Sequence, residues 1–412
     1  MRDNGMVIVG AGEAGARAAV ELRTQGWKGA ITIIGDENRY PYERPPLSKQ
    51  QLNGEEAPQP VTIVDEARLR ELDIQLLAGD KAVRIDREGH AVELASGARV
   101  SYAKLLLATG AGPRRLAANG DGAQEMLYLR TFADALRLRT RLKPGNRIAV
   151  IGGGFIGLEV AASAVALGCE VTLVEIAARI LMRGVPAEIA VMVEERHRAA
   201  GVRFKTGVLI DRVEKEGEEL VLKLADGTAI RCDAIVTGIG AIPAAALAEE
   251  CGLDIENGVK VDATLATSDP DIYAAGDCCS FPHPLYGGRR IRLEAWRNAQ
   301  DQGTHAAGNM LGAGLPYEAL PWFWSDQYDQ TLQVAGLSDG ADTTVTRDLG
   351  EAGKLFFHIA GDGSVAAVSG MGPAGAFAKE FRLAEMLIER RARPEPAALS
   401  DPGRKLKELL RA

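Results

Sequence analysis

The stretch MVIVGAGEAG, residues 6–15, places an apolar run directly before three glycines at the spacing GxGxxG. The helical pattern EAGARAAVELRTQG follows, and a second apolar run, AITIIGDE, ends in acid. In such a strand–turn–helix unit the glycines let the backbone approach a pyrophosphate, which the helix N-terminus holds with its free N–H groups. We predict a dinucleotide site with Gly10, Gly12 and Gly15 in its loop and Asp36 as the acceptor for an adenosine ribose. A glycine turn that binds nothing is the alternative.

The same device recurs in IAVIGGGFIGLEVAASAVALGCEVTLVE, where Gly152, Gly154 and Gly157 are followed by Glu175 at the end of the next apolar run. A second fingerprint in one chain makes a chance match improbable. An acid at Glu175 favours the free 2′-hydroxyl of NAD(H) and repels the 2′-phosphate of NADP(H). Arg179 either softens that preference or belongs to a solvated helix face.

Composition excludes several classes of function. The chain has 412 residues, 46% hydrophobic and 25% charged, with a net charge of −8. An acidic protein lacks the basic field of a general nucleic-acid binder or a membrane-surface protein. The five cysteines show no metal-ligand spacing, so we expect no metal site. The first residues enter a strand and a glycine turn at once, and no long apolar run follows, so we expect a cytoplasmic protein without a membrane segment.

Two further segments have the pattern of buried strands that end in glycine, LLLATG at 105–110 and AIVTGIGAIP at 234–243, and a third strand is expected in ATSDPDIYAAGD at 266–277. The last of them leads to Asp277. Ligands of parallel sheets bind outside the carboxyl ends of the strands, so this carboxylate is a candidate for a ligand hydroxyl. A helix N-cap is the alternative.

The order of these motifs resembles the flavoproteins with two dinucleotide-binding domains, which bind FAD first and NAD(P)H second. Four segments narrow the resemblance: PYERPPLSK, GGGFIGLE, LEAWRNAQDQG and PWFWSDQY. Together they are similar to the putidaredoxin reductase and biphenyl-dioxygenase ferredoxin reductase family. The similarity extends over essentially the whole chain.

The resemblance implies an α/β fold with two Rossmann-like dinucleotide-binding domains of the glutathione-reductase-like type and an α+β C-terminal domain. It places the FAD domain at 1–112 and 240–319, the NAD domain at 113–239 and the C-terminal domain at 320–412. The cofactors that it implies are FAD and NADH.

The resemblance also assigns candidate contacts to single residues. Those implied for FAD are Asp36, Lys49, Arg130 and Asp277, with Ala14 and Ala82 through the backbone, Arg44 as a further contact, and Trp296 and Trp324 near the isoalloxazine. Those implied for the nicotinamide coenzyme are Ile156, Glu159, Arg183 and Gly238 in addition to the second glycine loop. On pattern alone, Arg130 is equally a solvated loop residue, Arg183 a helix-end cation, and both tryptophans core residues.

Hydride transfer between nicotinamide and flavin needs no protein acid or base, so the catalytic candidates are residues that position the two rings. We propose Lys49 and Glu159 for this role, as an ion pair beside the flavin N5. An incidental surface pair is the alternative.

The destination of the electrons follows from a missing residue. Disulfide reductases of this superfamily carry redox cysteines soon after the first ribose acid, whereas here no cysteine precedes Cys169. An external acceptor remains, and the resemblance implies a [2Fe–2S] ferredoxin that serves a bacterial cytochrome P450 or ring-hydroxylating oxygenase. We expect docking near Arg289, Arg290, Arg297 and Trp324, unless this charge run is only a solvated face. A rubredoxin reductase and an apoptosis-inducing-factor-like NADH sensor are the alternatives.

Overall fold

The computed structural model describes residues 5–182 and 184–410. The chain divides into two compact units, each of which is discontinuous in sequence. The first consists of Met1–Arg44, Pro60–Gly112 and Ala241–Ala319, and the second of Pro45–Gln59, Pro113–Gly240 and Leu320–Ala412.

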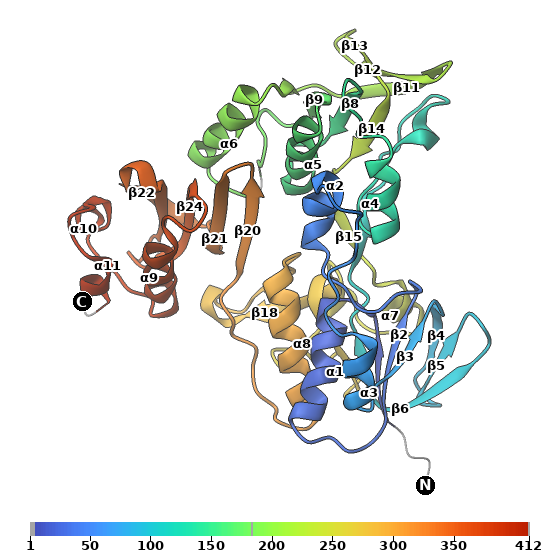
Figure 1. Cartoon of the computed structure of the whole chain (residues 1–412). Helices are drawn as coiled ribbons and strands as arrows, with labels where there is room; N and C mark the ends of the chain where they lie inside the picture. Colours follow the sequence, from blue (N-terminus) through green and yellow to red (C-terminus); the bar gives the residue numbers. More distant parts are fainter. Residues whose placement is uncertain (1–4, 183, 411–412) are drawn as a thin grey trace. The chain divides into compact units, whose positions relative to one another are not determined.

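A mixed sheet forms the centre of the first unit (Figure 1). Its parallel strands, in spatial order, are β3 (Gln75–Ala78), β2 (Ile31–Gly35), β1 (Gly5–Val9), β6 (Arg99–Leu107) and β17 (Ile272–Ala274). Antiparallel strands β5 (Ala91–Leu94) and β4 (Ala82–Asp86) extend it beyond the first half of β6. The parallel strands end at one edge, which places the first glycine loop and the segment after β17 at that edge.

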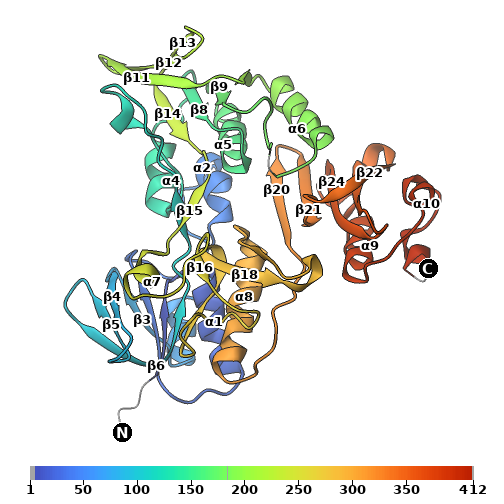
Figure 2. The same cartoon turned by 180° about the vertical axis from the view of Figure 1, so that it is seen from behind.

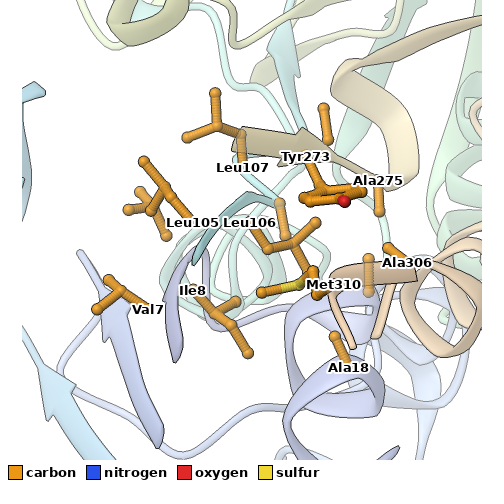
Figure 3. Packing of buried hydrophobic residues seen from close by; sticks show 14 of the residues in the cluster. Val7, Ile8, Ala18, Leu105, Leu106, Leu107, Tyr273, Ala275, Ala306 and Met310 are labelled. Atoms are coloured by element: carbon orange, nitrogen blue, oxygen red, sulfur yellow. The ribbon is translucent and has the colours of Figure 1, made fainter. Parts of the chain in front are cut away.

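Two helices cover one face of this sheet. Helix α1 (Glu13–Thr24) begins directly after the first glycine loop, and α8 (Trp296–Met310) runs beside it. Figure 3 shows Ile8, Leu106 and Met310 meeting between sheet and helices, and all three side chains are buried. The close approach of the helices requires a glycine at position 303, where a Cβ would lie 2.2 Å from the carbonyl oxygen of Ala14.

Shorter elements complete the first unit. The helices are α3 (Glu66–Glu71) and α7 (Ala246–Glu250), and a small sheet contains β16 (Val259–Lys260), β18 (Cys279–His283) and β19 (Arg289–Ile291). Strands β7 (Ala111–Pro113) and β15 (Ala241–Pro243) pair where the chain passes between the units.

The second unit contains another parallel sheet and two antiparallel sheets. The parallel strands, in spatial order, are β10 (Arg203–Thr206), β9 (Glu170–Glu175), β8 (Arg147–Ile151) and β14 (Ala234–Thr237). The accompanying helices are α4 (Phe132–Arg139), α5 (Phe155–Ala166) and α6 (Ala187–Ala199). A separate antiparallel sheet contains β11 (Ile210–Glu216), β12 (Glu219–Leu224) and β13 (Ala229–Cys232).

The last third of this unit is an antiparallel sheet with helices on it (Figure 2). Its strands, in spatial order, are β20 (Trp322–Gln327), β21 (Gln330–Gly336), β24 (Val365–Pro373), β23 (Lys354–Ala360) and β22 (Ala341–Asp348). The helices are α9 (Ala378–Glu389), α10 (Pro396–Ser400) and α11 (Leu406–Leu409), and their apolar residues share one core with the sheet.

The proline-rich segment joins the second unit although it is far away in sequence. It forms the 3-10 turn η1 (Pro45–Ser48) and the short helix α2 (Gln50–Asn53). Arg139, the last residue of α4, donates hydrogen bonds to the carbonyl oxygens of Gln51 and Gly54 at 3.3 and 2.7 Å. Helix α4 therefore anchors the segment that carries Lys49.

The predicted fold class is confirmed: the chain has two Rossmann-like units of strand, glycine loop and helix, followed by an α+β C-terminal part. No helix among the described residues is long and apolar enough to cross a membrane.

Two buried histidines link the stability of the second unit to pH. His197 lies in α6 and His358 in β23, where its ring nitrogens lie 3.1 Å from Ser369 Oγ and 3.3 Å from Thr344 Oγ1. Burial disfavours the charged imidazolium and lowers the pKa of each histidine to about 4. Since an unfolded histidine has a pKa of about 6.5, protonation favours the unfolded state between these two values.

We therefore expect stability to be fully present above about pH 6.5 and to be lost as the pH falls toward 4. Between about pH 7.5 and about pH 5, each of these histidines should lower the free energy of unfolding by roughly 2 kcal/mol. Urea denaturation followed by circular dichroism measures this, and His358→Gln should reduce the difference between the two pH values. An unchanged difference in the variant would contradict the assignment.

Candidate functional site

In the first glycine loop, two glycines are required by the protein itself. A Cβ on Gly10 would lie 2.0 Å from the carbonyl oxygen of Ala108, and one on Gly15 would lie 2.0 Å from that of Gly10. Gly12 differs, because, apart from Gly12 and its two neighbours in sequence, no atom of the described residues lies within 4 Å of the position where its Cβ would stand. Gly12 is also the N-cap of α1. The open space therefore lies where the loop meets the helix N-terminus.

The second loop repeats this arrangement. A Cβ on Gly152 would lie 2.4 Å from the carbonyl oxygen of Gly238, and one on Gly157 would lie 2.1 Å from that of Gly152. At Gly154, the N-cap of α5, the nearest such atom is the oxygen of Gly238 at 3.9 Å. In both loops the middle glycine leaves room that internal packing does not use, as close approach of a pyrophosphate requires. Both loops therefore fit a dinucleotide.

The two predicted ribose acids lie at the carboxyl ends of parallel strands. Asp36 follows β2 directly and is exposed. Glu175 is the last residue of β9, where its carboxylate accepts hydrogen bonds from the backbone N–H groups of Gly153 at 2.6 Å and Ala177 at 2.7 Å. The second acid is therefore held against its own glycine loop.

Arg179 belongs neither to a solvated helix face nor to an open anion site. Its guanidinium donates hydrogen bonds to the backbone oxygens of Ile180, Leu181 and Val185 at 3.1, 3.2 and 3.1 Å. The side chain thus ties together the loop that follows β9, and its donors point to that loop.

The other first-unit candidates lie around the same sheet. Arg44 pairs with Glu37 at 2.9 Å and donates to the Tyr42 hydroxyl at 3.1 Å. Asp277 is half-buried in the 3-10 turn after β17, which ends at Ala274. Ala14 is buried in α1, Ala82 begins β4, and Trp296 begins α8.

The second-unit candidates lie at the ends of its helices and strands. Arg130 directly precedes Thr131, the N-cap of α4. Ile156 is the second residue of α5 and is about half exposed, and Gly238 follows β14 with its N–H bonded to Ile151. Arg183 lies outside the described residues.

Lys49 and Glu159, from segments far apart in sequence, meet in the second unit. Lys49 Nζ lies 3.1 Å from Glu159 Oε1, and the carboxylate side chain is only 5% exposed. The ammonium also lies 6.0 Å from the centre of the Trp324 ring. The pair is therefore no incidental surface contact, because one of its members is buried.

Two serine hydroxyls complete the environment of Glu159. Ser48 Oγ donates to Oε2 at 2.5 Å, and Ser325 Oγ donates to Oε1 at 2.6 Å. Both serines are buried, and Ser48 is fixed in turn because its carbonyl oxygen accepts from Ser163. Sequence reasoning missed Ser48 and Ser325, although each is adjacent to a predicted residue, Lys49 or Trp324.

The predicted docking arginines all lie in the first unit, and they differ in the contacts that their guanidinium groups make within the protein. Arg289 is exposed and lies over the Tyr286 ring. Arg290 donates to the carbonyl oxygens of Val261 and Ser280 and pairs with Glu256, so its guanidinium holds the small sheet together. Arg297 lies 3.8 Å from Asp301 one helical turn away.

The adjacent cysteines Cys278 and Cys279 are both buried. Burial raises the pKa of each thiol, that of Cys279 well above its ordinary value. Because the thiolate is the reactive form, neither is suited to thiol–disulfide exchange.

Two dinucleotide loops on two parallel sheets, with a positioned ion pair and no early cysteine, define a flavoprotein oxidoreductase that uses a nicotinamide coenzyme. The comparisons with known proteins agree. Residues 5–303 match the pyridine nucleotide-disulphide oxidoreductase family, and residues 322–410 match the reductase C-terminal domain.

Full-length relatives share well over a third of their residues with the chain. The ferredoxin–NAD(+) reductase component of the anthranilate 1,2-dioxygenase system of Burkholderia cepacia is 40% identical, with 98% of each chain covered. Putidaredoxin reductase CamA of Pseudomonas putida is 37% identical, with 100% of this chain and 97% of the relative covered.

The fold agrees as closely as the sequence. The crystal structure of the covalent putidaredoxin reductase–putidaredoxin complex matches with a TM-score of 0.93 at 37% identity, covering 99% of this chain and 98% of that one. The chain belongs to the pyridine nucleotide-disulphide oxidoreductase family. It is an FAD-dependent oxidoreductase, and the prediction of FAD and NADH as its cofactors is confirmed.

Two matched variants test the open space at the loops. Gly12→Val should lower the FAD content of the purified protein, because the side chain would fill the space at the N-terminus of α1. Gly154→Val should retain FAD but raise the Kd for NAD+ by roughly tenfold or more, since it blocks the second loop only. Flavin absorbance and calorimetric titration measure the two effects, and each variant is the control for the other. Equal losses of FAD in both would contradict the assignment of loops to cofactors.

Proposed function

We propose that the chain passes electrons from NADH through FAD to a [2Fe–2S] ferredoxin that serves a bacterial cytochrome P450 or ring-hydroxylating oxygenase. The observation that carries this proposal is similarity over the whole chain to ferredoxin–NAD(+) reductase components of dioxygenase systems and to putidaredoxin reductase. In addition, the first cysteine of the chain is Cys169, which lies far beyond Asp36 in the sequence. Electrons therefore have no early dithiol on which to stop.

FAD, when bound, accepts a hydride from the nicotinamide and releases the two electrons singly. The protein's part is to bind and orient. Gly12 and Gly154 admit the two pyrophosphates, Asp36 and Glu175 accept hydrogen bonds from the two adenosine riboses, and Asp277 bonds the ribityl chain. Arg44 and Arg130 are further contacts to FAD.

The Glu175 environment supports NADH as the coenzyme. Two backbone N–H groups hold its carboxylate against the glycine loop, where it would repel a 2′-phosphate. Arg179, which the sequence offers as a cation to offset that charge, donates hydrogen bonds to backbone oxygens.

Lys49 and Glu159 form the polar end of the nicotinamide site. A carboxamide presents one acceptor and two donors, and the pair offers an ammonium donor and a carboxylate acceptor side by side. Held 3.1 Å apart, these groups fix which way the carboxamide faces and so which face of the ring presents its hydride.

Replacing Lys49 with Met should slow flavin reduction by NADH by roughly tenfold or more, because Glu159 loses its counter-ion and the carboxamide loses a donor. Anaerobic stopped-flow absorbance measures the rate. Lys104→Met is the matched control, since Lys104 is similarly exposed and pairs with Asp271 in the first unit. Unchanged reduction in the Lys49 variant would remove the pair from the mechanism.

We assign electron exit to Trp324, in the second unit, and attraction of the ferredoxin to Arg289 and Arg297, in the first. Acidic ferredoxins need a local positive field on a reductase whose net charge is −8. Arg290 contributes less than the sequence indicates, because its guanidinium is bonded to backbone oxygens.

NADH-driven cytochrome c reduction through ferredoxin should fall steeply as the salt concentration rises, since exposed charges are screened within about 10 Å at 0.1 M salt. The double variant Arg289→Ala, Arg297→Ala should flatten this dependence. Arg70→Ala, Arg84→Ala removes the same charge from exposed positions in the first unit and is the control. A wild-type rate that does not change with salt would contradict electrostatic docking.

The same assay, run with a [2Fe–2S] ferredoxin, with rubredoxin and with neither, tests the proposed function. The proposal predicts cytochrome c reduction that requires ferredoxin. Turnover with rubredoxin alone would identify a rubredoxin reductase, and a long-lived reduced enzyme that serves neither carrier would favour an NADH sensor.

A further inference from the structure

Hydrogen bonds continue behind Ser325, away from Glu159. Gln327 Nε2 donates to Ser325 Oγ at 2.8 Å, and Gln327 Oε1 lies 2.9 Å from Nε2 of His197. The other ring nitrogen, Nδ1, lies 3.2 Å from the Tyr328 hydroxyl. Ser325, Gln327 and His197 are all at most 1% exposed. A polar chain thus runs through the interior of the second unit and ends on the Glu159 carboxylate.

The hydrogen-bond donors in this series of side chains all point toward Glu159. His197 is neutral near pH 7, because burial lowers its pKa to about 4, so one ring nitrogen donates and the other accepts. Its Nε2–H faces the amide oxygen of Gln327, which leaves Nδ1 to accept from the Tyr328 hydroxyl. The Ser325 hydroxyl already accepts from the amide of Gln327, so its single proton goes to Glu159. Aligned bonds of this kind reinforce one another in a buried site.

The β20–β21 hairpin, which contains Ser325 and Gln327, is bonded to helix α6. Figure 2 shows β20 and β21 beside α6, and Tyr328 lies in the turn between the strands with φ 60°, a left-handed value unusual for a tyrosine. Its ring packs at 4.9 Å against His197 and at 4.3 Å against the Arg196 guanidinium. Arg196 also pairs with Asp329, the next residue of the turn, at 2.7 Å. Such strain persists where the surroundings over-determine the conformation.

The partners of Glu159 differ in how firmly each is held. Lys49 reaches Oε1 on a flexible stem and is one-quarter exposed. Ser325 reaches the same oxygen from a fully buried strand position. Buried Ser48 holds the other oxygen, Oε2, so with Lys49 alone on Oε1 only one of the two carboxylate oxygens would have a firmly held partner. Ser325 therefore restricts the orientation at Oε1, and the lysine supplies the charge.

We propose that Ser325, supported by Gln327, His197 and Tyr328, is a positioning residue that holds the Glu159 carboxylate in the orientation that the nicotinamide of NADH requires. The proposal rests on the role assigned above to Glu159 in the reaction with NADH. In this proposal the β20–β21 hairpin contributes residues that position the nicotinamide site.

The test is anaerobic stopped-flow reduction of the FAD-bound enzyme by NADH. Ser325→Ala should lower the limiting rate of flavin reduction by roughly tenfold, the scale of one lost hydrogen bond to a charged group. Ser325→Thr, which keeps the hydroxyl, should recover much of the rate. Ferredoxin reduction by Ser325→Ala enzyme that has first been reduced with dithionite should match the wild type, because that step does not involve Glu159.

A double-mutant cycle separates positioning from simple loss of packing. If Ser325 acts through Glu159, Ser325→Ala should have little further effect on the rate in a Glu159→Gln background. Ser369→Ala is the matched control: Ser369 is as fully buried in the same sheet and bonds His358, away from Glu159. It should change thermal stability but leave flavin reduction unchanged.

A wild-type rate in Ser325→Ala, or equal slowing in the wild-type and Glu159→Gln backgrounds, overturns the proposal. Should Ser325→Ala fail to fold, Gln327→Met decides, because it removes the donor behind the serine; reduction at the wild-type rate in that variant also overturns it. Failure of the proposed function is a different result, namely wild-type enzyme whose flavin NADH does not reduce.

Discussion

A single buried carboxylate, Glu159, constrains much of the second unit. Burying a charge is costly unless it is paired and hydrogen-bonded, so each of its oxygens must be satisfied by groups brought from elsewhere. Lys49 and Ser48 come from the proline-rich segment and Ser325 from the C-terminal hairpin. Glu159 lies early in α5, the helix that follows the second glycine loop, and is thus the point where three distant segments meet. This arrangement explains why the segment at 45–59 folds with the second unit and is anchored there by Arg139.

The two glycine loops show that one physical solution was used twice. In each loop, a Cβ on the first or the third glycine would lie too close to a backbone oxygen, so these positions require glycine. The middle glycine faces open space at a helix N-terminus. The acids that follow are treated differently: Asp36 is exposed, whereas Glu175 is bonded to its own loop. This difference affects the choice of coenzyme. Glu175 would repel a 2′-phosphate, and Arg179, the cation of that loop within the described residues, already donates to backbone oxygens.

Much of this could be predicted from sequence because it depends on local patterns. Apolar runs, glycine spacing and terminal acids identify strand–turn–helix units, and the motif around Lys49 and Glu159 identifies the pair. The hydroxyl partners could not be predicted in this way. A serine has no periodic signal, and whether Ser48 and Ser325 face the same carboxylate depends on contacts between segments more than a hundred residues apart. The same holds for Arg290 and Arg179, which look like solvated cations in the sequence but satisfy backbone oxygens in the fold.

Under the proposed function the chain has two separate tasks. It binds the nicotinamide at a site built around Glu159, and it delivers electrons to a separate protein, because no early dithiol can retain them. The most direct test is an anaerobic titration of the FAD-bound enzyme and oxidised [2Fe–2S] ferredoxin with NADH, followed by the visible absorbance of both proteins. The account predicts that each NADH reduces two ferredoxins, since the hydride carries two electrons and each cluster takes one. Reduction of the flavin by NADH while the ferredoxin stays oxidised would contradict it.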